Sequence, residues 1–565
     1  MSSSADTRFA PDAAALLAGL DDHQREAAMS VSGPMLIVAP AGSGKTRTIV
    51  HRIAYGIQVG AFEAEHTMAI SFTNRAAGEL RDRLQALGAH KVTARTFHAA
   101  ALRQLRFFWP SIEHRPLPNL RTDRAVVLSE IASLPVFDLD SSSIKQVVTL
   151  IESAKAQAFG PEGIQEFILG QRLLPDVTIG PHIVGEIYSS YEDANVAANT
   201  MDFDDVIARL VGIFDAQPAT AAAVQRQYRH LTVDEFQDTT RVQRALLTAW
   251  TGPARDVCAV GDPHQSIYGF AGASADAMQW FGRTYSGCET VRLDTCYRST
   301  PQIIRFGARI RAALDDRTTV RSVRDAGAEV SVLPAFADEI TEIRRIAAAI
   351  SDLVRDGAEP SHIAVLSRIS AQGALMEEAL ANLGLPGITA APAGYFSRPL
   401  VRKAITLLRG ASHDPRASEV PLADSVADVL STMGWEPVLP ALTGSKRQDW
   451  LYLQALVRCA EDFEHLHQSA TLAEFVIELD RRADLASPPT VHAVSLLTAH
   501  ASKGLEWPHV FIIGMSEGLF PYGPKLTEAA MAEERRLFYV AATRARDSLT
   551  VSGFGRFSSL VAGAS

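Results

Sequence analysis

The sequence has 565 residues, is 47% hydrophobic and 21% charged, and carries a formal net charge of −10. This composition is typical of a soluble globular protein, and the length predicts about three or four domains rather than one core. No apolar run reaches the length of a membrane span, the N-terminus lacks the apolar core of a signal peptide, and the four cysteines have no paired spacing. We therefore expect a cytoplasmic protein with no membrane contact, disulfide framework, zinc or iron–sulfur site. The acidic total does not favour nucleic acid, although only the local charge of the contacting surface decides this.

Residues 20–27, LDDHQREA, predict a helix with Asp21 or Asp22 as its N-cap. The amide of Gln24 in this helix offers a donor and an acceptor together, which suits a base edge. An equally good alternative is that Gln24 is a solvated helix residue.

The stretch PMLIVAPAGSGKTR predicts a buried strand, a glycine loop and a helix that begins near Lys45. Gly42 and Gly44 allow the loop to turn its backbone N–H groups inward, and these groups with the helix N-terminus form an anion site. Lys45 would reach the outer phosphates of a nucleotide, and the Thr46 hydroxyl would ligate magnesium. The full pattern has glycine where this chain has Ala39. The alternative is a glycine-rich turn between a core strand and a helix.

Residues 66–84 and 91–105 each contain a short apolar run, a polar turn and a helical pattern, which is typical of a parallel α/β sheet. Functional side chains in such sheets gather at the carboxyl ends of the strands, where this chain has Phe72, Thr73, Asn74, Thr96 and His98. Thr and Asn can bond phosphate oxygens, and Phe can stack on a base. Alternatively, Thr73 and Asn74 cap a helix, while Phe72 and Phe97 pack in the core.

The strand pattern lapses from about residue 106 to 200, where residues 141–159 and 181–199 have helical spacing. We expect a helical insertion within the first sheet at this place. Residues 201–210 then return to the α/β part of the chain.

Strands resume with HLTVDEFQDTTRVQ, in which Asp234 and Glu235 stand at the end of a strand. Asp234 can hold the magnesium that bridges the β- and γ-phosphates, and Glu235 can polarise a water for attack. Paired acids after a strand are usually a turn, but a preceding phosphate loop favours the metal and base roles.

Residues 256–273 contain a strand, the tight turn GDPHQ and two aromatic residues. Gln265 is placed to sense a γ-phosphate, and Tyr268 and Phe270 are spaced to present aromatic faces to successive bases. The alternative for these side chains is core packing beneath a glycine turn.

Residues 289–304 predict another strand and then a helix with a proline near its start. Tyr297 can stack on adenine, and Arg298 can neutralise phosphate charge.

The strings QREA, APAGSGKT, SFTNRAA, TFH, VDEFQD, GDPHQSIYGF and YRST, in this order, resemble the UvrD/Rep family of superfamily 1 DNA helicases. The resemblance implies an α/β protein with two RecA-like P-loop NTPase domains, whose parallel sheets are flanked by helices, and a helical insertion in each. The parts expected are a first RecA-like domain at 1–105 and 200–296, its insertion at 106–199, a second RecA-like domain at 297–409 and 490–565, and a reduced insertion at 410–489.

The second half of the chain carries further strings that resemble the family. In SLLTAHASKGLEW, the resemblance implies that Thr498 and His500 face DNA and that Glu506 holds the ribose. In EERRLFYVAATRARDSLTV, it implies that Arg544 is an arginine finger. Adenine would lie between Tyr297 and Arg47.

The resemblance implies an ATP-dependent 3′–5′ DNA helicase and translocase that holds ATP and Mg²⁺ in a cleft between two sheets and moves along single-stranded DNA. The expected partners are single-stranded DNA and junctions of single and double strands, with a nuclease or a repair protein as a candidate protein partner. Catalysis is assigned to Lys45, Glu235, Gln265, Arg298 and Arg544, and the metal to Thr46 and Asp234. The residues assigned to ATP are Gln24, Ala41, Gly42, Ser43, Gly44, Lys45, Thr46, Arg47, Tyr297, Arg298, Glu506 and Arg544. Those assigned to DNA are Phe72, Thr73, Asn74, Thr96, His98, Tyr268, Phe270, Thr498 and His500.

The chain also departs from the family pattern. Ala271 replaces an arginine, Phe270 stands where tryptophan is common, and Cys296 replaces an asparagine. The first two changes weaken the inferred DNA contacts but not the ATP site. Because the insertion at 410–489 is short, the alternative is a translocase subunit of a nuclease-containing complex, as in phage defence, that unwinds little alone. We expect no nuclease domain after Arg546, and the intact set of charged residues disfavours a DNA-binding scaffold with an inactive ATP site.

Overall fold

The computed structural model describes residues 12–170, 179–252, 256–389, 395–413, 420–438, 445–467, 470–484, 489–523 and 526–562. The chain divides into two compact units, the first formed by Met1–Cys296 with Leu526–Glu533 and the second by Tyr297–Lys525 with Glu534–Ser565. Within the described residues, no helix has the length and apolar character needed to cross a membrane. The expectation for the first eleven residues lies outside the described part of the chain.

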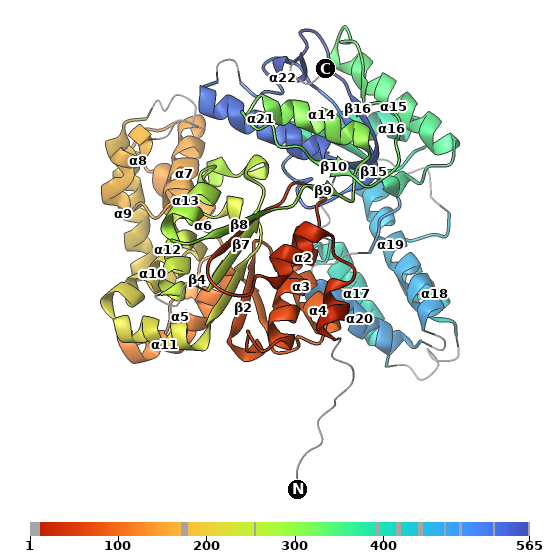
Figure 1. Ribbon diagram of the computed structural model, residues 1–565. Helices are drawn as coiled ribbons and strands as arrows, with labels where there is room; N and C mark the ends of the chain where they lie inside the picture. The colour runs from red at the N-terminus through yellow and green to blue at the C-terminus, as the bar shows by residue number, and fades with distance from the viewer. Residues whose placement is uncertain are drawn as a thin grey trace. The chain divides into compact units, whose positions relative to one another are not determined.

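The first unit is built on a six-stranded sheet with the order β3-β2-β6-β7-β1-β8, and every neighbouring pair is parallel. Parallel neighbours need crossover connections, which helices supply here (Figure 1). The strands are β1 (Met35–Val38), β2 (Thr67–Ser71), β3 (Thr93–Thr96), β6 (His230–Val233), β7 (Val257–Gly261) and β8 (Glu289–Arg292), and β9 (Thr295–Cys296) ends the unit. The predicted α/β class is therefore confirmed.

Helices cover both faces of this sheet because successive strand residues point to opposite sides. Leu36, Met68 and Ile70 join the core under α5, α10, α12 and α13, whereas Met35 and Ala69 join the core under α2, α3 and α4. The bounds are α1 (Ala13–Leu17), α2 (Asp22–Met29), α3 (Lys45–Gln58), α4 (Asn74–Ala86), α5 (Phe97–Glu113), α10 (Phe203–Ala216), α11 (Pro218–Gln227), α12 (Arg241–Thr251) and α13 (Ala277–Thr284).

The region for which a helical insertion is predicted forms a group of helices with its own hydrophobic core. The two segments with helical spacing form α7 (Ser141–Ala156) and α9 (Pro181–Ala197). They pack with α6 (Arg124–Ala132) and α8 (Ile164–Gly170), beside a two-stranded parallel pair of β4 (Asn119–Leu120) and β5 (Thr200–Met201). The predicted boundary after residue 105 falls inside α5, because the helix runs on to Glu113.

Short 3₁₀ helices mark the turns of both units. In the first unit they are η1 (Ala64–His66), η2 (Pro161–Gly163), η3 (Phe236–Asp238), η4 (Pro263–Gln265) and η5 (Gly269–Ala271), and in the second η6 (Pro360–His362). Two of them, η4 and η5, follow β7 and carry the predicted site residues Gln265 and Phe270, whereas η3 follows β6 and has Glu235 as its N-cap.

The second unit contains another six-stranded sheet, in the order β11-β16-β15-β12-β14-β13, again with parallel neighbours. Its core on one face lies under α15 and α16. The strands are β10 (Arg321–Ser322, outside this sheet), β11 (Ser331–Val332), β12 (Ile363–Ser367), β13 (Gly387–Ile388), β14 (Val494–Thr498), β15 (Trp507–Ile512) and β16 (Ala545–Val551). The helices near this sheet are α14 (Pro301–Ala312), α15 (Glu339–Arg355), α16 (Ser370–Asn382), α21 (Glu528–Ala542) and α22 (Ser559–Ala562).

The expected short insertion in the second unit is also helical. It consists of α18 (Leu422–Ser431), α19 (Ser445–Leu466) and α20 (Leu472–Asp484), and α17 (Pro399–Ala411) shares their hydrophobic core. The predicted boundary after residue 409 therefore falls inside α17. Residues 414–419, 439–444, 468–469 and 485–488 of this region, and residues 390–394 before it, lie outside the described part.

Candidate functional site

The glycine loop connects β1 to α3 as the sequence predicts. Gly42 and Gly44 have φ values of 75° and 80°, and the helix begins directly after them, at Lys45. This left-handed backbone lets a loop aim consecutive N–H groups at one anion. Ala39 is buried and is not among the described residues with positive φ, so its side chain introduces no such strain. The missing glycine therefore does not disturb the loop.

An ion pair joins this loop to the acidic residues that follow β6. The Nζ of Lys45 lies 2.9 Å from Oε1 of Glu235, and the Thr46 hydroxyl donates to Oδ2 of Asp234 over 3.4 Å. Burial acts to lower the pKa of Lys45, but the carboxylates of Glu235, Asp262 and Asp234 outweigh it and raise the pKa. Burial, then the charge of Glu235, raises the pKa of Asp234. The structure thus brings together the four residues predicted for phosphate, metal and base.

Glu235 has a backbone conformation that is uncommon for its residue type. Its φ of 50° and ψ of 43° lie in the left-handed region, which costs roughly 1–3 kcal/mol for a residue with a side chain. Such strain persists where the surroundings hold the residue in place, and here the Lys45 ion pair does so. The acidic pair is thus held against the glycine loop rather than standing as an ordinary solvated turn.

Two residues with no predicted role, Gln237 and Asp262, extend this cluster. Gln237, which is fully buried, donates from Nε2 to Oε2 of Glu235 and accepts at Oε1 from the backbone N–H of Asp262 over 3.0 Å. Asp262 in turn accepts at Oδ2 from Nε2 of Gln265 over 2.8 Å. Gln237 and Asp262 therefore orient the predicted base and the predicted γ-phosphate sensor. Their only signal in the sequence is that they lie within VDEFQD and GDPHQ.

Gln24 is part of the loop structure, so the alternative of a solvated helix residue is wrong. The side chain is 1% exposed, donates from Nε2 to the Ser43 carbonyl over 2.9 Å and accepts from the Asp21 N–H over 3.3 Å. Asp21 is the N-cap, as predicted. A Cβ at Gly44 would lie 2.7 Å from Nε2 of Gln24, so the amide closely fits a residue without a side chain. Arg47 lies near this region, where it donates to the Gly19 carbonyl over 2.8 Å.

Four of the predicted DNA residues line one groove of about 350 Å³ in the first unit: Phe72, His98, Tyr268 and Phe270. The rings of Phe72 and Tyr268 stack with centroids 5.5 Å apart, and Tyr268 and Phe270 meet edge to face at 6.1 Å. Phe72 and Phe270 are 38% and 54% exposed, so core packing is wrong for both, whereas Phe97 is buried as the alternative predicted. Exposed stacked rings of this kind form a platform for planar groups.

The charged residues of this groove are mostly acidic. Glu152, Asp204 and Asp238 line it together with one arginine, Arg124, which pairs with Glu152 and Asp204. A phosphate backbone would gain little attraction here. The groove is therefore suited to bases, which bind through stacking, more than to phosphates.

The remaining DNA candidates of the first unit act as helix caps or helix residues. The Thr73 hydroxyl accepts from the Ala76 N–H over 3.1 Å, and the Thr96 hydroxyl accepts from the Ala99 N–H over 3.2 Å. The capping alternative is thus confirmed for Thr73, while Asn74 is the first residue of α4. These side chains are not among the groove-lining residues.

The loop that carries Phe270 is attached to the helical insertion. The Ser153 hydroxyl of α7 donates to the Phe270 carbonyl over 3.0 Å. At Gly272, which has a φ of 85°, a Cβ would lie 2.7 Å from Cγ of Gln157. The Gly269 N–H donates to Oε1 of Glu533 over 3.0 Å. Contacts with α7 therefore set the position of this aromatic residue.

In the second unit, Arg298, Glu506 and Arg544 form one cluster. Arg298 pairs with Glu506 at 2.5 Å and donates to the Thr543 carbonyl over 3.2 Å. Arg544 is 2% exposed and donates to the Val540 carbonyl over 2.8 Å and to the Leu505 carbonyl over 3.2 Å. Both guanidinium groups are thus engaged within their own unit, and the neighbouring Tyr297 has an exposed ring.

Thr498 and His500 lie at the end of β14 and just beyond it. The Thr498 hydroxyl accepts from the Ala501 N–H over 3.3 Å. Burial and the charges of Arg368 and Lys503 lower the pKa of His500 to about 4. His500 is therefore neutral near pH 7 and can contact a ligand only through a neutral imidazole.

Comparison with known proteins gives a consistent result over the whole chain. The UvrD/REP helicase N-terminal domain matches residues 20–286, and the UvrD-like helicase C-terminal domain matches residues 291–418 and 424–555. The chain is 36% identical over 556 residues to the ATP-dependent DNA helicase UvrD2 of Mycobacterium tuberculosis, a match that covers 95% of this chain and 79% of that protein. It is 29% identical to DNA helicase II of Haemophilus influenzae (96% and 85% covered) and 28% identical to the ATP-dependent DNA helicase PcrA of Bacillus subtilis (94% and 82% covered).

Proposed function

Since this chain belongs to the UvrD/REP helicase family, whose domains are RecA-like P-loop folds, we propose that it is an ATP-dependent DNA helicase. It hydrolyses ATP at the glycine loop, moves along single-stranded DNA from 3′ to 5′ and separates duplexes at junctions. The observation that carries the proposal is the ion pair of Lys45 with Glu235 at a left-handed glycine loop, in the same unit as the aromatic groove.

The proposed roles at the nucleotide follow from the side chains that meet at the loop. Lys45 and the loop N–H groups bind the phosphates, and Glu235 accepts a proton from the attacking water while Gln237 holds its carboxylate. Thr46 and Asp234 supply a hydroxyl and a carboxylate oxygen, the donors that Mg²⁺ prefers, so these residues fit that ion. When bound, Mg²⁺ would neutralise charge on the phosphates.

We assign further contacts to the second unit. Arg298 and Arg544 neutralise charge on the same phosphates during hydrolysis, Glu506 holds the ribose, and Tyr297 stacks on adenine. Because both arginines are engaged within their own unit, the proposal requires their hydrogen bonds to be exchanged for bonds to phosphate. An arginine in this role is worth roughly a thousandfold or more in rate.

DNA is proposed to bind through bases stacked on Phe72, Tyr268 and Phe270, with Thr498 and His500 as contacts from the second unit. Stacking contributes about 1–3 kcal/mol per base and does not depend on sequence. The acidic residues of the groove support base stacking as the main term there. This predicts that the aromatic contacts add affinity without adding salt dependence.

The test uses the full chain with duplexes that carry either a 3′ or a 5′ single-stranded tail. We expect ATP-dependent unwinding of the 3′-tailed duplex alone, and loss of DNA-stimulated ATPase activity in Glu235→Gln. The matched control is Lys145→Ala, an exposed charge change on α7 outside both sites. Full ATPase activity in Glu235→Gln would refute the assigned base, and preference for the 5′ tail would refute the direction. Unwinding by the isolated chain would also exclude a role only as a subunit of a larger complex.

A further inference from the structure

A second cavity in the first unit, of about 620 Å³, is separate from both proposed sites. It lies where β2 and β3 begin, as Met68 is the second residue of β2 and Thr93 the first of β3, whereas the glycine loop and the groove follow strand ends. No residue lines both this cavity and the aromatic groove. The lining comes from β2, β3, α5 and the end of α11: Met68, Thr93, Arg95, Ala100, Arg103, Gln104, Arg106, Phe107, Phe108, Ala223, Val224, Gln227 and Tyr228.

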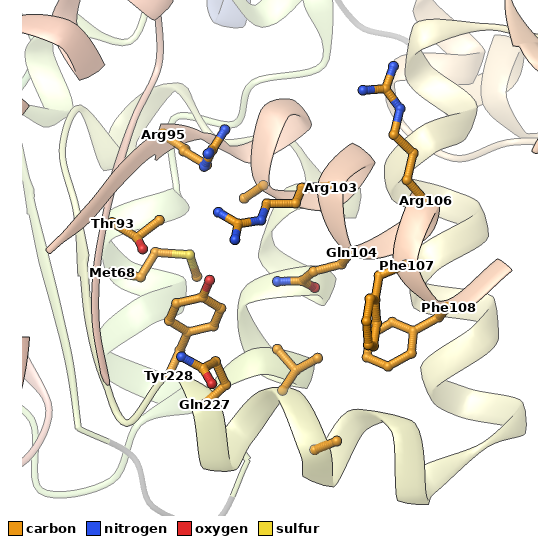
Figure 2. A pocket seen from close by; sticks show the side chains of 13 residues that line it. Met68, Thr93, Arg95, Arg103, Gln104, Arg106, Phe107, Phe108, Gln227 and Tyr228 are labelled. Atoms are coloured by element: carbon orange, nitrogen blue, oxygen red, sulfur yellow. The ribbon is translucent and has the colours of Figure 1, made fainter. Parts of the chain in front are cut away.

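Three arginines and no carboxylate line this cavity. Arg95 stands on the face of β3 that α5 covers, a position where a parallel strand normally has an apolar residue. Arg103 reaches from α5 toward Arg95, while Arg106 points away from both (Figure 2). Across the described ranges of the chain, none of the three has an ion pair with a carboxylate. The cavity is therefore a concentration of uncompensated positive charge.

The electrostatic surroundings of Arg95 point in the same direction. Burial is the largest effect that lowers the pKa of Arg95, and the charges of Arg103 and Arg81 lower it further. Like charges at a partly buried place destabilise one another unless an anion lies between them. Each guanidinium group can donate two parallel hydrogen bonds to phosphate oxygens, so phosphate is the anion that best fits two neighbouring arginines.

The rest of the cavity wall is aromatic and amide. Phe107 is 77% exposed, and it meets Phe108 edge to face with centroids 5.0 Å apart. Arg103 and Phe107 are four residues apart on α5, so the charged and the aromatic groups lie on one helix face. Gln104 accepts at Oε1 from Nε1 of Trp250 over 2.8 Å, which fixes the amide and leaves its NH₂ group to donate.

From these observations we propose that the cavity binds one nucleotide unit, with its phosphate on Arg95 and Arg103 and its base against Phe107 and Phe108. Its volume lies in the range of about 300–1,000 Å³ that is typical of small-ligand sites. The unit comes either from a free nucleotide or from a DNA strand, because both offer the same phosphate and base. This proposal does not depend on the assigned hydrolysis site.

The test measures binding of thymidine monophosphate and of a 5′-phosphorylated tetrathymidylate to the full chain by calorimetry. All proteins carry Lys45→Ala, which is expected to weaken phosphate binding at the glycine loop and lies outside this cavity. We expect Arg103→Gln to weaken binding of at least one probe by tenfold or more. The matched control is Arg83→Gln, an exposed arginine of α4 outside the cavity, which should leave the affinity unchanged.

The two probes separate the two sources. If binding of the monophosphate depends on Arg103, a free nucleotide is sufficient to occupy the cavity. If only binding of the tetranucleotide depends on Arg103, the ligand is a DNA strand. Equal affinities in Arg103→Gln and Arg83→Gln for both probes overturn the proposal. Hexaglutamate is measured as a third ligand, and Arg103-dependent binding of hexaglutamate without such binding of either nucleotide probe also overturns the proposal, because it would indicate an acidic peptide instead.

A second measurement uses thermal unfolding in place of calorimetry. Arg95→Gln removes one of the repelling charges, so we expect a higher melting temperature without ligand and a smaller gain when thymidine monophosphate or the tetranucleotide is added. A lower melting temperature together with an unchanged gain from the probe would overturn the phosphate role of Arg95.

Discussion

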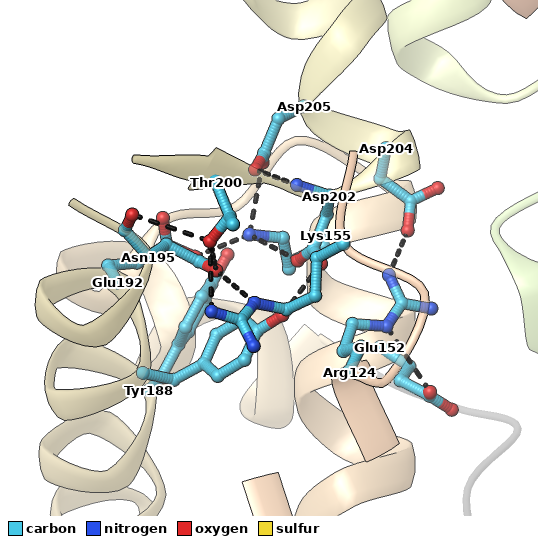
Figure 3. Close-up of polar contacts among 12 residues, drawn as sticks. Arg124, Glu152, Lys155, Tyr188, Glu192, Asn195, Thr200, Asp202, Asp204 and Asp205 are labelled. Atoms are coloured by element: carbon cyan, nitrogen blue, oxygen red, sulfur yellow. Dashed lines mark hydrogen bonds and ion pairs between the residues drawn. The ribbon is translucent and has the colours of Figure 1, made fainter. Parts of the chain in front are cut away.

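Two lysines of the first unit have similar surroundings but different chemistry. Lys45 lies 2.9 Å from Glu235, with Asp234 and Asp262 close enough to raise its pKa. Lys155 of α7 pairs with Glu192, and with Asp202 and Asp205 at 3.0 Å each, as Figure 3 shows. Burial acts to lower the pKa of Lys155, and the surrounding carboxylates outweigh it and raise the pKa. Each lysine is thus a cation fixed among three carboxylates.

The difference lies in what surrounds the carboxylates. The Lys155 cluster is enclosed: the Tyr191 hydroxyl donates to Asp202 over 2.6 Å, and the Asp202 N–H donates to Asp205 over 2.9 Å. Its three carboxylates are spaced as metal ligands would be, but the lysine ammonium group already lies among them. Lys45 instead begins a helix after a left-handed glycine loop, whose backbone N–H groups are proposed to bind an anion. Burial of a lysine among acidic residues therefore does not by itself indicate a functional site. Hydrogen-bond donors that can bind a ligand must also lie nearby.

The largest effect that separates the two lysines is on activity. We expect Lys45→Met to lower DNA-stimulated ATPase activity by about a hundredfold or more, because a positive charge at the phosphates is lost. The melting temperature should change little, since Asp234 and Glu235 can take up protons or a cation in its place. Steady-state ATPase assays and thermal unfolding of the same preparation check both parts. Wild-type ATPase activity in Lys45→Met would contradict the expected functional difference between Lys45 and Lys155.

Replacement of Lys155 should have the opposite result, a loss of stability without a loss of ATPase activity. Lys155→Met leaves the buried carboxylate of Asp202 and the half-buried carboxylates of Glu192 and Asp205 without their cation, which we expect to lower the free energy of unfolding by about 3–5 kcal/mol. ATPase activity without DNA should persist at temperatures where the variant is folded. Denaturant unfolding measures the loss, with Lys145→Met on the same helix as the control that should change neither quantity. Stability equal to the wild type would mean that the enclosed cluster contributes nothing.

A glycine substitution sharpens the comparison by keeping Lys45 and altering its loop. Gly44→Ala forces a side chain into left-handed backbone, at roughly 1–2 kcal/mol, and against Nε2 of Gln24. We expect ATP affinity to fall by about tenfold. Gly60→Ala is the matched control, because Gly60 has a φ of 77° but no atom within 4 Å of the added Cβ. Equal ATP affinity in the two variants would show that the loop conformation does not set binding.

The smallest expected effect is the pH dependence of the enclosed cluster. Burial is the main cause that raises the pKa of Glu192, Asp205 and Asp202 add to it, and Lys155 opposes it. The folded chain therefore holds this proton more tightly than the unfolded chain, so the stability from Glu192 is present at low pH and is lost as pH rises through the folded pKa. Relative to Glu192→Gln, the wild type should lose melting temperature as pH rises above the ordinary glutamate pKa of about 4.3. If the melting temperatures of the wild type and of Glu192→Gln change in parallel with pH, the raised pKa of Glu192 is contradicted.

The sequence predicted the parallel sheets, the strand at Met35–Val38 and the meeting of Lys45 with Asp234 and Glu235, because local patterns specify each of these. It could not tell Phe72 from Phe97, since both follow a strand and only packing decides which ring is buried. Gln237 and Asp262 were missed because they act through hydrogen bonds to the residues proposed for catalysis. A buried residue in that position has no sequence pattern of its own.

The Lys155 cluster could not be foreseen for a different reason. Its members come from α7, α9 and the start of α10, and only the folded chain brings them together. The arginine cavity is similar, because Arg95 and Arg103 belong to a strand and a helix whose separate patterns look ordinary.

The attachment of the Phe270 loop to α7 has a consequence for how this protein can vary. Ser153 and Gln157 contact that loop, yet neither carries an aromatic ring nor touches the nucleotide loop. Substitutions along this inserted helix would therefore alter the proposed binding of a single strand, in either direction, without changing the residues proposed for hydrolysis. In this architecture, the proposed binding of single-stranded DNA and the proposed hydrolysis of ATP depend on different segments of the chain, so each can vary separately.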